Sequence, residues 1–148
     1  MKYLTIRSLL LNAGLLLLLI GTAVLFYPVA FFEANGSTLG NVPSLLSEIR
    51  AYGGLLIGCS FVVLLGVFQQ RFSQTALLLA TTVYLSVGIS RLTSFLFDGL
   101  PSSTLVGSTI VELCVGALCA ASLRHLNSKH KALAERHSIV RQEAVPSN

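Results

Sequence analysis

The chain has 148 residues, of which 53% are hydrophobic and only 11% are charged, and its formal net charge is +4 at pH 7. With a mean hydropathy of +0.77, this composition excludes an ordinary soluble globular domain and indicates an integral membrane protein. Because several membrane spans use up most of a chain of this length, we expect one membrane unit without a separate soluble domain.

Four apolar stretches follow one another, each close to the roughly 20 residues that a membrane-spanning helix needs. They cover approximately residues 9–32, 51–68, 75–97 and 103–123. Short polar segments separate them, so neighbouring helices should run antiparallel. The sequence therefore predicts an all-α fold, a polytopic four-helix transmembrane bundle over residues 1–126, followed by a basic tail at 127–148.

The first stretch also has features of a secretory signal, because Lys2 and Arg7 precede its apolar run. That run is longer than the apolar region of about 7 to 15 residues in a typical signal peptide. We therefore expect an uncleaved span, and cleavage near Ala30 is the alternative.

The basic residues predict the orientation of the bundle. With four spans, the N-terminus, the second loop and the tail share one side of the membrane, and that side carries Lys2, Arg7, Arg71, Arg124, Lys129, Lys131, Arg136 and Arg141. The opposite side has only Arg50 and Arg91. The positive-inside rule then places both termini in the cytoplasm. The net positive charge should face anionic lipid, and no nucleic-acid-binding motif is present.

Five ionisable residues fall in the other, outer half of the predicted bundle: Glu48, Arg50, Arg91, Asp98 and Glu112. A charge inside the apolar region costs roughly 2.5 to 3.5 kcal/mol on insertion scales, so each needs a physical reason. At 1.5 Å per residue, Arg91 lies about 9 Å before the end of the third stretch and Glu112 about 14 Å after the start of the fourth. We expect their side chains to meet.

Small residues predict where the helices approach one another. On the third stretch a polar and small face recurs at steps of three or four residues, formed by Tyr84, Gly88, Arg91, Ser94 and Asp98. Glycine permits close contact between helices in membranes, and the expected packing positions are Gly53, Gly54, Gly58, Gly88 and Gly116. Gly54 and Gly58 have G-x-x-x-G spacing.

The charged residues admit three interpretations. In the first, Arg91 pairs with Glu112 or Asp98 and Arg50 pairs with Glu48, which fixes the helix register without a ligand. In the second, the same groups line an outward-facing polar cavity for a proton, an anion or a lipid headgroup. The third, in which the side chains extend to the lipid headgroups, is disfavoured for Glu112 by its depth.

Two runs of residues resemble a bacterial membrane family called domain of unknown function 4345. They are SEIRAYGG at 47–54 and SRLTSFLFDGLPS at 90–102, and Glu112 in the fourth helix adds to the likeness. The resemblance extends to about residue 126 and implies a multi-pass protein of the bacterial inner (plasma) membrane, similar in layout to DoxX-like four-helix proteins. It implies no reaction, and it marks Glu48, Arg50, Gly53, Gly54, Arg91, Asp98, Gly99, Pro101 and Glu112 as the positions to test.

Cysteine and histidine give no sign of a metal or cofactor site. The cysteines lie within apolar stretches without a C-x-x-C pair and should pack as small apolar residues: Cys59, Cys114 and Cys119. The histidines lie in or beside the tail, so none is placed to ligate a haem within the membrane: His125, His130 and His137. We expect no cofactor and no metal.

The tail admits two interpretations. Leu126, Leu133 and Val140 recur every seven residues among basic side chains, as in a short helix lying at the membrane surface. A partly disordered basic tail is the alternative.

Three functions are compatible with these features, and the sequence favours the first. It is a non-enzymatic structural or accessory membrane subunit that contacts the lipid bilayer and assembles with itself or with a larger membrane partner. The second is a transporter of a small solute, an anion or a proton that uses Arg91 and Glu112. The third is a lipid- or quinone-linked enzyme subunit with Glu112, Glu48 or Asp98 as acid or base.

Overall fold

The computed structural model describes residues 2–143, and the side chains of residues 4–128. The described chain is helical, with α1 (Lys2–Phe26), α2 (Pro28–Ala34), α3 (Pro43–Phe68), the 3-10 turn η1 (Gln70–Phe72), α4 (Ser73–Phe97) and α5 (Ser103–Glu143). Four of these segments are long and apolar enough to cross a membrane: Leu4–Phe26, Pro43–Phe68, Gln70–Phe97 and Ser103–Ser128. The predicted all-α, four-helix transmembrane fold is confirmed.

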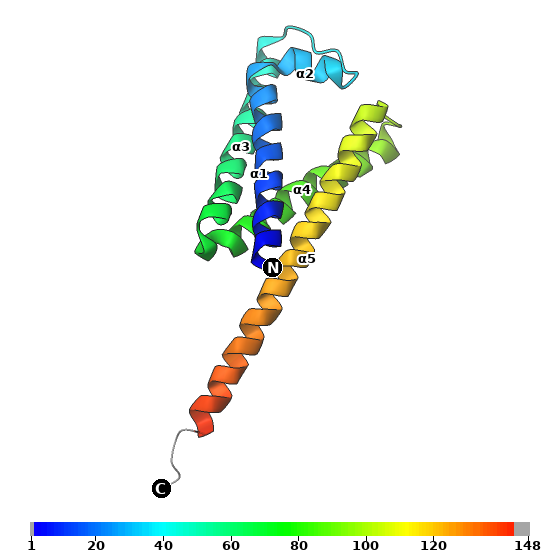
Figure 1. The fold of residues 1–148 in the computed structure, drawn as a ribbon. Helices are drawn as coiled ribbons and strands as arrows, with labels where there is room; N and C mark the ends of the chain where they lie inside the picture. Colours follow the sequence, from blue (N-terminus) through cyan, green and yellow to red (C-terminus); the bar gives the residue numbers. More distant parts are fainter. Residues whose placement is uncertain (1, 144–148) are drawn as a thin grey trace.

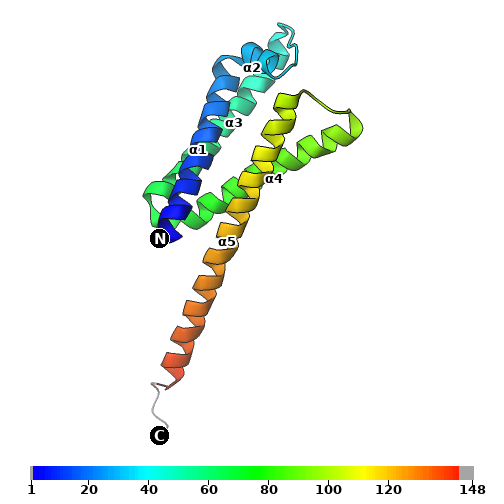
Figure 2. The same cartoon turned by 45° about the vertical axis from the view of Figure 1, so that its right-hand side comes forward.

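The long helices form two pairs, which diverge toward one end of the bundle (Figure 1). α1 packs along α3, and α4 packs along α5. The two pairs meet near the end that carries the N-terminus, which we call the N-terminal end. They separate toward the opposite end, where α2 lies, and we call this the α2 end (Figure 2).

Two helix boundaries differ from the prediction because of proline. The first apolar stretch is not one helix, since it breaks at Tyr27, whose backbone has φ −127° and ψ 51°. Pro28 disfavours a helical conformation at the residue before it and starts α2 at its own first position. The second span begins at Pro43 instead of near residue 51, so Glu48 and Arg50 lie within the first turns of α3.

The last span also continues beyond its predicted end. α5 is helical through Glu143 and runs on in line with the span, away from the bundle (Figures 1 and 2). Residues 127–143 are rich in good helix formers and contain no glycine or proline, which favours continuation. The helix therefore has no break at the expected start of the tail, and residues 144–148 lie outside the described part.

Glycines allow the two helices of each pair to approach closely. A Cβ on Gly53 of α3 would lie 2.7 Å from the backbone nitrogen of Leu25 in α1, and one on Gly21 would lie 2.9 Å from the carbonyl oxygen of Gly53. In the second pair, a Cβ on Gly88 or on Gly116 would lie 2.7 Å from a leucine side chain of the facing helix. Gly53, Gly88 and Gly116 thus occupy helix contacts within the chain.

Gly54 and Gly58 have a different environment. A Cβ at either position would meet no described atom within 4 Å. Both residues are exposed on α3, so their G-x-x-x-G spacing does not pack α3 against another described helix of the same chain.

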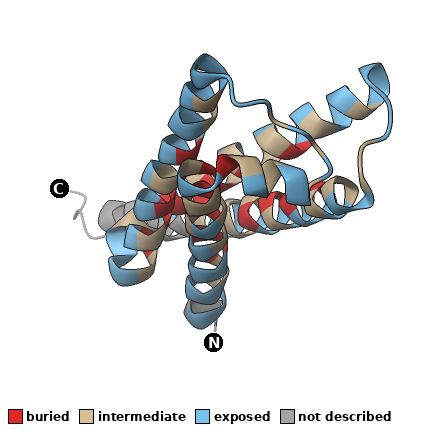
Figure 3. Ribbon diagram, turned by 90° about the horizontal axis from the view of Figure 1, so that it is seen from above, coloured by how far each residue is buried: buried red, intermediate tan, exposed pale blue. Residues whose placement is uncertain are grey.

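The core lies where the two pairs meet. Buried apolar side chains from α1, α3, α4 and α5 form one cluster, which includes Leu10, Leu17, Val63, Leu77 and Cys119. Viewed along the bundle, the buried positions lie on the parts of the helices that are close to one another (Figure 3). This cluster holds the two helix pairs together near the N-terminal end, and the pairs separate toward the α2 end.

Replacing Gly53 by valine should destabilise the bundle, because the new side chain overlaps the backbone of α1. We expect a loss of about 1 to 3 kcal/mol in the free energy of unfolding, measured by reversible denaturation in detergent. Gly107→Val in α5 is the control, because a Cβ there would meet no described atom within 4 Å, and it should change the free energy of unfolding by no more than about 0.5 kcal/mol. Equal losses in the two variants would contradict the packing described for Gly53.

Candidate functional site

Arg91 of α4 and Glu112 of α5 form an ion pair inside the second helix pair. Arg91 Nε lies 3.1 Å from Glu112 Oε2, and the two side chains are 31% and 9% exposed, respectively. The angle is not that of a hydrogen bond, and Oε2 accepts none from the residues that the structure describes. The contact is therefore mainly a Coulomb attraction between a well-buried carboxylate and a partly exposed guanidinium.

Close packing of α4 against α5 brings Arg91 and Glu112 together. Gly88 precedes Arg91 by about one turn and contacts Leu113, the neighbour of Glu112 in the chain. Gly116 lies about one turn after Glu112 and contacts Leu85. These two close contacts hold α4 against α5 beside the pair, so the charged side chains reach each other.

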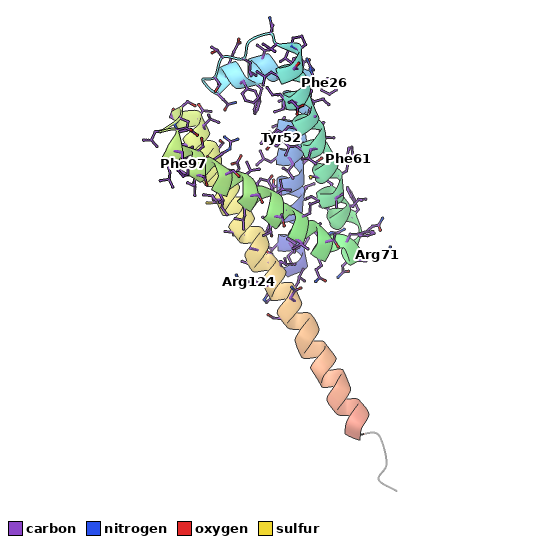
Figure 4. The ribbon with its side chains drawn as sticks, turned by 180° about the vertical axis from the view of Figure 1, so that it is seen from behind. Phe26, Tyr52, Phe61, Arg71, Phe97 and Arg124 are labelled. Carbon is purple, nitrogen blue, oxygen red and sulfur yellow. The ribbon has the colours of Figure 1, made fainter. Side chains whose placement is uncertain are left out.

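A cavity of about 280 Å³ lies between the two helix pairs, beside this ion pair. Most of its wall is apolar and comes from all four long helices together with Phe31 and Phe32 of α2. The polar residues that line it are Asn35, Ser37, Tyr52, Tyr84, Arg91 and Glu112. In Figure 4, Tyr52 lies beside the space between the helix pairs.

Tyr84 lines the side of the cavity nearest the core and joins two helices there. Its side chain is 2% exposed, and its hydroxyl donates a hydrogen bond of 2.7 Å to the carbonyl oxygen of Ala13 in α1. The bond connects the α4–α5 pair to the α1–α3 pair.

The segment from α2 to Ser37 covers the opposite side of the cavity. The rings of Phe31 and Phe32 meet edge to face with centroids 5.8 Å apart. Ser102, just before α5, donates a hydrogen bond of 2.7 Å to the carbonyl oxygen of Asn35. This bond joins the loops of the two helix pairs at the α2 end.

A second hollow, the serine groove, adjoins the cavity. It has a volume of about 420 Å³ and is lined by Tyr52, Ser86, Val87, Ser90, Arg91 and Ser94. Tyr52, Val87 and Arg91 also line the cavity, so the two spaces share a wall. The groove thus lies at the surface of α3 and α4, next to the cavity and to Arg91.

The five predicted ionisable residues do not form one cluster in the described chain. Of these, Arg91 and Glu112 line the cavity, whereas Asp98 is exposed at the end of α4 and accepts a hydrogen bond of 2.8 Å from Ser94. Glu48 is also exposed. These charges are therefore divided between the Arg91–Glu112 pair at the cavity wall and separate surface positions.

Arg50 does not pair with Glu48 in the described structure, because residues two apart on a helix face different directions. Its guanidinium instead donates to the carbonyl oxygen of Leu25 near the end of α1. At the other end of the same helix pair, Arg7 Nε donates a hydrogen bond of 2.8 Å to the carbonyl oxygen of Val67 near the end of α3. The last carbonyls of a helix lack partners within it, so each arginine caps the neighbouring antiparallel helix.

Sequence reasoning missed part of the lining. Ser86 and Ser90 precede Ser94 at steps of four residues, and this spacing was visible in the sequence. Tyr52 is adjacent to Gly53 and showed no separate signal. Asn35 lines the cavity only because the helix breaks at Pro28, and the continuous apolar pattern gives no sign of this break.

The described residues contain no group of three histidine, cysteine, aspartate or glutamate side chains that could hold a metal ion. The three cysteines are unbridged, with Cys119 buried, Cys59 half-buried and Cys114 exposed.

Four membrane-spanning helices in two diverging pairs define a small multi-pass membrane protein with an ion pair and a cavity between its helices. The sequence model of the family described as "Domain of unknown function (DUF4345)" matches residues 5–123, and the chain belongs to this family. Neither the comparison with curated proteins nor that with solved structures gave a match. The likeness in layout to DoxX-like proteins stays a prediction.

Tyr84→Phe should weaken the connection between the two helix pairs. Loss of the hydroxyl removes the bond to Ala13 while keeping the ring, and we expect unfolding to require about 0.5 to 1.5 kcal/mol less free energy. Denaturation in detergent measures this change. Tyr27→Phe is the control, because Tyr27 is 70% exposed; a loss as large in the control would argue against the specific role of Tyr84.

Proposed function

We propose that the protein is a non-enzymatic accessory membrane subunit that binds a small amphiphilic molecule between its two helix pairs. The observation that carries this proposal is the cavity of about 280 Å³, apolar over most of its wall, with the Arg91–Glu112 pair at its side. Binding sites for small molecules are typically apolar hollows with a few placed polar groups. A buried carboxylate and its partner supply those groups here.

The proposed orientation puts the α2 end on the outer side of the bacterial inner membrane and both termini in the cytoplasm. The distribution of lysine and arginine supports it. The cavity then opens in the outer half of the bilayer, where amphiphilic molecules of that leaflet have access.

A larger assembly is part of the same proposal. Gly54 and Gly58 leave a small-residue surface on α3 that no described part of the chain covers, and such surfaces allow another helix to approach closely in a membrane. A second copy of the chain or another membrane protein fits this surface.

Transport of a proton or an anion is the second candidate, favoured by the ion pair at the cavity wall. A pathway across the bundle would have to pass the packed core between the cavity and the N-terminal end, which includes Leu10, Leu77 and Cys119. Binding requires no such opening. A flux of protons or anions into proteoliposomes would favour transport over binding, provided that the Glu112→Gln variant abolishes it.

Native mass spectrometry of the protein released from lipid nanodiscs tests the proposal. Wild-type protein should retain a small-molecule adduct, and Ile20→Trp should lose it, because Ile20 lines the cavity and the larger ring fills it. Leu19→Trp is the matched control on the next residue of α1, where the side chain is 69% exposed, and it should retain the adduct. A wild-type protein without an adduct, or equal retention in Ile20→Trp, would contradict the proposal.

A further inference from the structure

The serine groove adjoins the cavity on the surface of α3 and α4. The two hollows share Tyr52, Val87 and Arg91. From Ser86 to Ser94 the groove extends about 12 Å along α4, at 1.5 Å per residue, and ends about one turn before Asp98. Within a hydrocarbon core of about 30 Å, it leads from the middle of the membrane toward the surface at the α2 end.

Of the three serines that line the groove, Ser94 donates to Asp98, and the other two have no hydrogen-bond partner among the described residues. Thr82 and Thr93 of α4 donate to carbonyl oxygens four residues earlier, each at 3.0 Å. Ser86 and Ser90 line the groove as exposed residues of α4 and make no such bond to the described residues. In a membrane, lipid chains would cover this exposed face, and a hydroxyl without a partner in such an apolar environment costs about 1 to 3 kcal/mol. A ligand with hydrogen-bonding groups is therefore favoured there.

The charges beside the groove favour an uncharged ligand. Arg91 and Glu112 together carry no net charge, and they are already in contact. A carboxylate or phosphate would compete with Glu112 for Arg91, and an ammonium group would compete with Arg91 for Glu112. An ester or hydroxyl head leaves the pair intact and can still accept hydrogen bonds from the remaining N–H groups of the guanidinium.

The volume of the cavity limits the apolar part of the ligand. A dry apolar cavity of about 150 Å³ holds one benzene molecule, and the cavity here has about 280 Å³. That space fits a segment of one hydrocarbon chain and is too small for two chains side by side. Its apolar wall, with Phe31 and Phe32 on the far side, suits such a segment.

From these observations, and resting on the proposed function, we infer that the ligand is a single-chain lipid with an uncharged hydroxyl- or ester-bearing head, such as a monoacylglycerol. The head lies in the serine groove against Ser86, Ser90 and Arg91. The chain passes between Tyr52 and Val87 into the cavity.

Photocrosslinking in nanodiscs with a monoacylglycerol that carries a diazirine in its acyl chain tests the inference. We expect the label on peptides of α1 and α4 that line the cavity, and competition by unlabelled monoacylglycerol at lower concentration than by a fatty acid, a lysophospholipid or a diacylglycerol. Ser86→Ala combined with Ser90→Ala should weaken labelling about tenfold, from the loss of two hydrogen bonds. Thr93→Ala is the control, since the Thr93 hydroxyl bonds within α4, and should not change it.

The outcomes separate this inference from the proposed function. If wild-type protein retains an adduct that Ile20→Trp loses, but the fatty acid or the lysophospholipid competes best, the uncharged head is wrong and binding in the cavity stands. If the diacylglycerol competes best, the single chain is wrong. If the double serine variant is labelled as strongly as wild-type protein, the proposed position of the head group in the groove is wrong. If neither adduct nor label is found, both proposals fail.

Discussion

Arg91 and Glu112 bring two opposite charges to one place inside an apolar bundle, 3.1 Å apart, and the second helix pair is organised around this contact. Removing one partner from a buried pair leaves an uncompensated charge, which is more harmful than replacing both. Gly88 and Gly116 permit the close approach of α4 and α5 that the pair requires. The two opposite charges compensate each other within one helix pair, at the wall of the cavity that lies between this pair and the other.

The first helix pair is held by different contacts. Its helices touch through the backbone at Gly21 and Gly53, and Arg7 and Arg50 each cap the last carbonyls of the opposite helix. Tyr84 then connects this pair to α4. The helices within each pair are therefore in close contact, and the two pairs are joined near the core. The pairs diverge toward the α2 end, and the cavity lies between them. Because the chain breaks before Pro28, α2 changes direction and covers one side of this cavity.

The sequence was sufficient for the parts of the structure that depend on local composition. Hydropathy located four spans, and the ends at Phe68 and Phe97 agree with the prediction. Proline lies within apolar segments of membrane proteins as well as between them, so the break at Tyr27 and the start of α3 at Pro43 were not evident. The contact between Arg91 and Glu112 followed from helical rise. The cavity and the capping role of Arg50 depend on how helices distant in sequence pack, which one sequence does not encode in a readable pattern.

The most direct test of this account is a double-mutant cycle on Arg91→Ala and Glu112→Ala, with the free energy of unfolding measured in detergent. We expect each single variant to be destabilised and the double variant to lose less than the two losses combined, with a coupling of about 0.5 to 3 kcal/mol. Losses that simply add would show that the two charges do not stabilise the bundle as a pair and would contradict the account.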